Sequence, residues 1–182
     1  MQTAIPNKQT NQKLEWTQMV IFCAYASAFF AAIGLIFLVI FFSGYSLFGP
    51  LNDIAVIIHY ILLLPIMVYI YKILRPEGER LHELTLAIGV IGAFGVVILQ
   101  ALLVLGVMPF TQQILLVIPA FLVGTVWFIL TERLGKHDER LPKGQVLHVL
   151  AGLVFAYPVW ALILASRLKS SLKARSTWTA AE

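Results

Sequence analysis

The sequence predicts an all-α fold, a polytopic membrane protein built as a bundle of five transmembrane helices. Hydrophobic residues make up 60% of the 182 residues and charged residues only 12%, about half of the roughly 25% that soluble domains carry. The apolar residues gather in runs of about 20, the length that a helix needs to cross the hydrocarbon core. None of the 13 lysine and arginine residues lies within residues 14–71 or 81–132. The basic residues therefore flank the apolar runs, as they do in membrane proteins.

Short polar breaks divide the chain into five segments of spanning length. The first follows a polar tail and is too long for the 7–15-residue core of a signal peptide. Proline and glycine interrupt the chain after each of the next segments, and Thr111 can cap the fourth helix. The predicted spans are Gln18–Phe42, Leu51–Leu74, His82–Val107, Gln112–Thr131 and Gln145–Ser166. We expect a cytoplasmic tail at residues 1–17, a five-helix transmembrane domain at 18–166 and a basic tail at 167–182.

The distribution of basic residues predicts the orientation of these spans. One side of the predicted bundle receives nine of them: Lys8, Lys13, Lys72, Arg75, Arg80, Arg133, Lys136, Arg140 and Lys143. The two loops on the other side contain none. The positive-inside rule then places the N-terminus in the cytoplasm, and we expect the protein in a plasma membrane. Because the bases follow the topology, we expect no nucleic-acid partner.

The C-terminal tail conflicts with this orientation. An odd number of spans sends four bases to the outside: Arg167, Lys169, Lys173 and Arg175. Either the fifth segment is re-entrant around Pro158, or the tail is tolerated outside as a weak, late signal. We favour the second explanation, because Gln145–Ser166 is long enough to cross.

Four polar residues inside the predicted spans are candidate ligand-binding residues, because polar groups are costly in lipid and need a reason to be there. They are Asn52, Asp53, His59 and Gln100, and the predicted orientation puts all four in the outer half. They could line an outward-facing pocket in which His59 exchanges protons or binds a ligand. Alternatively, Asn52 and Asp53 cap a helix, and His59 forms one interhelical hydrogen bond with Gln100.

Catalytic and cofactor chemistry has no recognisable motif in the chain. The single cysteine, Cys23, excludes an internal disulfide, and no spacing of Cys and His suggests a metal. Haem would need two imidazoles at one depth. His59 lies about 12 Å from the outer end of its predicted helix, whereas His82 and His148 lie near the cytoplasmic ends of theirs. We therefore predict no catalytic residue, no metal and no cofactor. The sequence favours a non-enzyme and leaves open an enzyme that acts on a hydrophobic substrate.

Several short motifs resemble a family of small bacterial integral-membrane proteins that is known only as a domain of unknown function. They are Leu51-Asn52-Asp53, LLLPIMVYIYKILRP from Leu62, LQALLVLGVMPFTQQ from Leu99, GTVWFIL from Gly124 and LPKG from Leu141. The resemblance covers roughly residues 50–165. It implies a bacterial polytopic protein and transfers no activity, ligand or catalytic residue.

These observations favour an accessory, assembly or partner-binding membrane protein. Its expected partners are the lipid bilayer and either another membrane protein or a second copy of the chain. The alternative is a small-solute or proton carrier that uses the outer-half pocket around His59.

Overall fold

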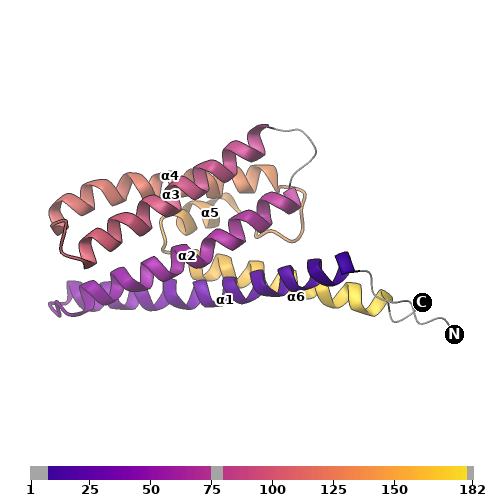
Figure 1. The fold of residues 1–182 in the computed structure, drawn as a ribbon, viewed down its shortest axis with the longest axis horizontal. Helices are drawn as coiled ribbons and strands as arrows, with labels where there is room; N and C mark the ends of the chain where they lie inside the picture. The colour runs from indigo at the N-terminus through magenta and orange to yellow at the C-terminus, as the bar shows by residue number, and fades with distance from the viewer. Residues whose placement is uncertain (1–7, 75–79, 180–182) are drawn as a thin grey trace.

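The computed structural model describes residues 8–74 and 80–179, with side chains for 12–74 and 80–174. These residues form helices and no strand (Figure 1). The helices are α1 (Lys8–Phe42), α2 (Phe48–Leu74), α3 (Arg80–Val104), α4 (Phe110–Leu134), α5 (Gln145–Gly152) and α6 (Tyr157–Thr179). Part of the predicted N-terminal tail is thus helical, since α1 begins at Lys8. Its first seven residues and Arg75 lie outside the described residues.

Four helices are long and apolar enough to span a membrane, which suggests a membrane protein. They are Gln12–Phe42 within α1, then α2, α3 and α4, whose most apolar windows have mean hydropathies of 2.3–2.5. The all-α prediction is confirmed. The predicted count of five spans is wrong, because the predicted fifth segment is divided between α5 and α6.

A turn at residues 153–156 divides the predicted fifth span. Val154 has a φ of 74°, a left-handed conformation that is costly for a β-branched residue. Its N–H bonds to the carbonyl of Ala151 at 2.9 Å, and the N–H of Ala156 bonds to that of Leu150 at 3.1 Å. Pro158 is then the second residue of α6, where the N–H that it lacks has no helical partner to lose.

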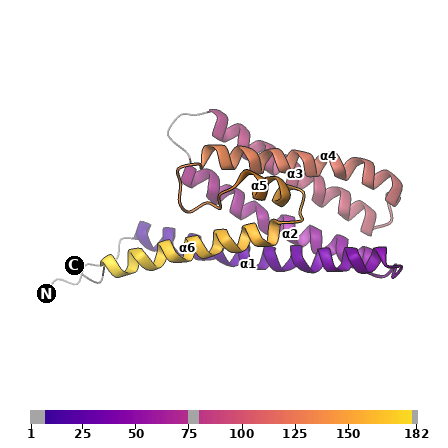
Figure 2. The same cartoon turned by 180° about the vertical axis from the view of Figure 1, so that it is seen from behind.

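The α5–α6 pair enters the bundle and returns to the end from which it came. The end of α4, the start of α1 and the end of α6 all lie at one end of the molecule (Figures 1 and 2). The α1–α2 and α3–α4 turns lie at the other end. This is the shape of the re-entrant alternative, which we had not favoured. It brings the basic C-terminal half of α6 to the same end as the other basic segments.

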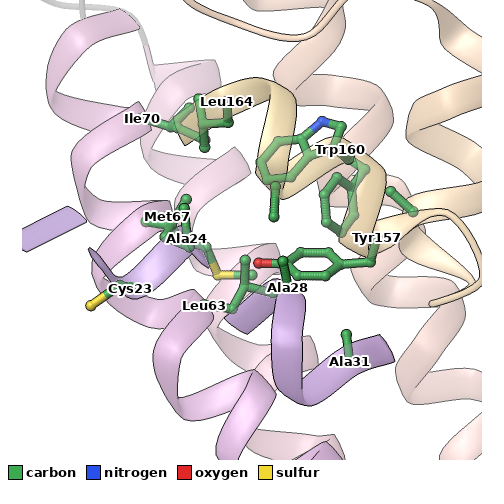
Figure 3. Packing of buried hydrophobic residues seen from close by; sticks show 14 of the residues in the cluster. Cys23, Ala24, Ala28, Ala31, Leu63, Met67, Ile70, Tyr157, Trp160 and Leu164 are labelled. Carbon is green, nitrogen blue, oxygen red and sulfur yellow. The ribbon is translucent and has the colours of Figure 1, made fainter. Parts of the chain in front are cut away.

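Large aromatic residues fill the centre of the bundle and hold α6 in place. Phe128 of α4 lies edge-on to Trp160 of α6, with ring centroids 4.9 Å apart, and Trp127 lies 6.3 Å from the same ring. Figure 3 shows Tyr157 pointing from α6 towards Ala28 of α1 and Leu63 of α2. Small residues such as Ala28 allow helices to approach closely where hydrophobic driving force is absent.

Glycine lets α5 and α4 touch through their backbones. A Cβ on Gly152 would overlap the backbone and side chain of Thr125, whereas a Cβ on Gly95 would meet Ala120 at an ordinary 3.6 Å.

We therefore expect Gly152→Ala to destabilise the protein by about 1–3 kcal/mol through overpacking. Gly95→Ala should be neutral or slightly stabilising, because alanine favours the helix by up to about 1 kcal/mol. Thermal unfolding in detergent, followed by circular dichroism, measures both. Equal melting temperatures for the two variants would contradict the close contact between α5 and α4.

Candidate functional site

The predicted site residues lie in three separate hydrogen-bonded groups. Asn52 donates from Nδ2 to Oδ1 of Asp53 at 3.2 Å, at the start of α2. The Asp53 side chain is buried, while the Oδ1 atom of Asn52 lies 3.5 Å from the position that a Cβ on Gly34 of α1 would occupy. Asn52 therefore faces α1 and holds its acidic neighbour by one hydrogen bond.

His59 belongs to the second group, which joins three helices. Its Nδ1 lies 2.9 Å from the hydroxyl oxygen of Ser27 on α1, and the same oxygen lies 2.7 Å from the hydroxyl of Tyr157 on α6. Ser27 also donates to the carbonyl of His59 at 3.3 Å. All three side chains are almost completely buried: Ser27 and Tyr157 have no exposed surface and His59 has 1%.

The Ser27 hydroxyl can take part in all three contacts, because a serine hydroxyl has one proton and two lone pairs. When its proton goes to the carbonyl of His59, one lone pair can accept from Tyr157 and the other from an Nδ1–H of His59. The direction of the bond between Ser27 and Nδ1 therefore depends on the tautomer of the imidazole.

Gln100 forms the third group with Gln113, whose Nε2 donates to Oε1 of Gln100 at 3.1 Å between α3 and α4. Both side chains are buried. Among the described residues, the alternative bond between His59 and Gln100 is not formed, because each has the other partners given above. Gln113, near the start of α4, is thus part of an interhelical bond.

Sequence reasoning missed Ser27 and Tyr157. Ser27 is a single serine in a run of alanine and aromatic residues, and a lone serine in a membrane helix does not by itself indicate a site. Its position next to Ala28, on the small-residue side of α1, was the available signal. A ligand-binding role for Asn52, Asp53, His59 and Gln100 remains a prediction.

A large cleft lies at the basic end of the bundle, away from these three groups. It has a volume of about 1040 Å³ and lies between the start of α1, the end of α2 and the loop after α4. Its lining residues are Gln12, Lys13, Glu15, Trp16, Thr17, Met19, Tyr69, Lys72, Ile73 and Arg140. Neither Asn52, Asp53, His59 nor Gln100 contributes to it.

Charged groups of the cleft differ in how far they are already paired. Arg140 donates from Nε to both carboxylate oxygens of Asp138, at 2.9 and 3.1 Å. This hydrogen bonding holds the pKa of Asp138 below its usual value. The ammonium of Lys72 lies 4.8 Å from the ring centroid of Trp16, a distance at which a cation is attracted to the ring face.

Lysine and arginine side chains of the loop and of α6 hold the loop that borders the cleft. Lys143 donates to the carbonyls of Gly135 and Lys136 at 2.9 and 2.8 Å, and Arg167 of α6 donates to that of Glu139 at 2.8 Å. These bonds satisfy carbonyls that have no helical partner. The loop therefore holds Arg140 at the cleft and ties the end of α4 to α6.

His148 lies behind this loop and is fully buried. Its Nδ1 lies 3.1 Å from the carbonyl of Gly144 and 3.6 Å from a carboxylate oxygen of Glu132. Burial lowers its pKa, against the smaller opposing effects of that carbonyl and of Glu132. The arrangement fits a neutral imidazole that lies just after the end of the loop. The described residues include no group of three or more His, Cys, Asp or Glu that could hold a metal.

No family model matches the chain, and no curated protein or solved structure shows a significant similarity to it.

We expect Ser27→Ala to destabilise the protein by about 1–3 kcal/mol, because it leaves the buried polar atoms of His59 and Tyr157 without their hydrogen-bond partner. Ser43→Ala is the matched control, since Ser43 is exposed and its hydroxyl donates to the carbonyl of Val39 in the last turn of α1. The control should change stability by less than about 0.5 kcal/mol. Urea or thermal unfolding in detergent compares the two, and an equal effect would show that the three-helix hydrogen bonds do not stabilise the fold.

Proposed function

We propose that this protein is an accessory, assembly or partner-binding component of a bacterial plasma membrane and performs no chemistry of its own. In this proposal the four long helices span the bilayer, α5 and α6 form a re-entrant pair, and the N-terminus lies in the cytoplasm. The positive-inside rule supports that orientation, because the basic segments that the structure describes lie at one end of the bundle (Figure 1).

The observation that carries the proposal is that five buried polar side chains bond to one another. Ser27, His59 and Tyr157 form one network, and Gln100 and Gln113 form another. Aromatic rings of α4 and α6 pack in the same interior, with Phe128 and Tyr157 centroids 6.1 Å apart. Buried polar groups that hydrogen-bond to one another help to specify a structure, and this use supports a packed bundle over a substrate path.

A carrier is the second candidate, and Asp53 favours it. This carboxyl group is 8% exposed, lies in a span and has Asn52 as its hydrogen-bond partner. An ionisable group at such a position is commonly part of an ion or proton pathway.

Site-specific photo-crosslinking in native membranes separates the two candidates. A photoreactive residue would replace Phe29 of α1, Ile91 of α3 or Leu115 of α4, which are 59%, 67% and 72% exposed. We expect at least one face to give a discrete protein adduct, either of twice the mass of the chain or of another defined mass. The other faces, which contact lipid, serve as matched controls.

A chain that forms only lipid adducts at all three positions, and that is also extracted as a lone species in a gentle detergent, would contradict partner binding. Such a result would favour the carrier.

A further inference from the structure

The cleft at the basic end contains positively charged and N–H groups that lack an ion-pair partner or a hydrogen-bond acceptor among the described residues. Among the described residues, the side chains of Lys13 and Lys72 form no ion pair, and the indole Nε1–H of Trp16 is buried without an acceptor. A buried donor without an acceptor is costly. Its position beside two ammonium groups indicates that an external acceptor with negative charge belongs there.

The charges of the cleft agree with this requirement. Lys13, Lys72 and Arg140 supply three positive charges, and Glu15 supplies one negative charge. Asp138 takes up the charge of Arg140, which leaves a net charge of +1 from the groups at the cleft. An anion with one charge therefore balances it.

The cleft also lies where a lipid headgroup would be. It lies at the start of α1, where the polar sequence around Lys13 and Glu15 gives way to the apolar run that begins at Met19. Trp16 and Tyr69 on its wall are the residue types that gather at membrane interfaces. Met19 continues the wall towards the apolar part of the bundle, so that the lining changes from basic to apolar along α1.

We propose that this cleft binds the phosphodiester headgroup of an anionic lipid. The ammonium groups of Lys13 and Lys72 and the Nε1–H of Trp16 contact the phosphate oxygens, and Met19 contacts the first carbons of an acyl chain. Basic pockets between transmembrane helices are suited to such headgroups. A free phosphate ion would satisfy the same donors but would leave the apolar wall unused. The proposal requires only that the spans lie in a bilayer, and it does not depend on the partner proposed above.

Native mass spectrometry of the full chain tests this proposal. The protein would be transferred into neutral detergent micelles that contain equal amounts of dioleoylphosphatidylglycerol and dioleoylphosphatidylcholine, which share their acyl chains and differ in net charge. We expect wild type to retain the anionic lipid over the zwitterionic one by about tenfold. The double variant Lys13→Gln/Lys72→Gln should reduce this preference to below about twofold.

Lys136→Gln/Lys169→Gln is the matched control, because it removes two exposed charges from the same end of the molecule outside the cleft. It should retain the preference of wild type. Trp16→Phe keeps an aromatic ring and removes the N–H, and we expect it to lower the retention of both lipids severalfold, because both carry the phosphate that the N–H contacts. This measurement tests the cleft even if the double lysine variant fails to fold. Addition of millimolar inorganic phosphate should leave the lipid adduct in place.

Equal retention of the two lipids by wild type would overturn the proposal. So would an equal loss of preference in both double variants, since that would reduce the effect to overall surface charge. Displacement of the lipid by inorganic phosphate would also contradict the proposal, since it would show that the cleft binds a free anion.

Discussion

The hydroxyl group of Ser27 is the point at which three helices of this protein meet. Its oxygen lies 2.7 Å from the hydroxyl of Tyr157 on α6 and 2.9 Å from the Nδ1 atom of His59 on α2. Tyr157 is the first residue of α6, so this bond anchors α6 at its deepest point. Without it, the packing of α6 against α1 would depend on apolar contacts alone, which give little specificity between helices in lipid.

This anchor makes the turn at residues 153–156 possible. Backbone that is not helical is tolerated at membrane depth only where protein covers it, and Val154 adds an unfavourable φ of 74°. Tyr157 follows the turn immediately, while Gly152 before it lies against Thr125 of α4. The two flanking contacts fix the turn between α1 and α4. The short helix α5 and the apolar first half of α6 can then replace a fifth span, and the C-terminal half of α6 returns to the basic end.

The extent to which this structure could be predicted follows from the kinds of signal in the sequence. Hydropathy identified α1 to α4, because each is a long apolar run with polar breaks. Hydropathy could not separate α5 from α6, since Val146–Ala165 is apolar apart from His148 and its turn depends on tertiary contacts. The four basic residues of the C-terminal tail did indicate that the chain turns back before it crosses. The partners of His59 and Gln100 were not predictable, because hydrogen bonding between helices depends on their rotation, which a single sequence does not fix.

Labelling of single cysteines tests the re-entrant path of α5–α6 most directly. In a Cys23→Ser background, Gln12→Cys, Ser46→Cys and Ser170→Cys place one exposed thiol at the start of α1, in the α1–α2 turn and on α6. A membrane-impermeant maleimide should label Ser46→Cys in intact cells, and the other two only after the membrane is opened. A thiol at position 170 that reacts from the same side as that at position 46 would contradict the account and restore a fifth span.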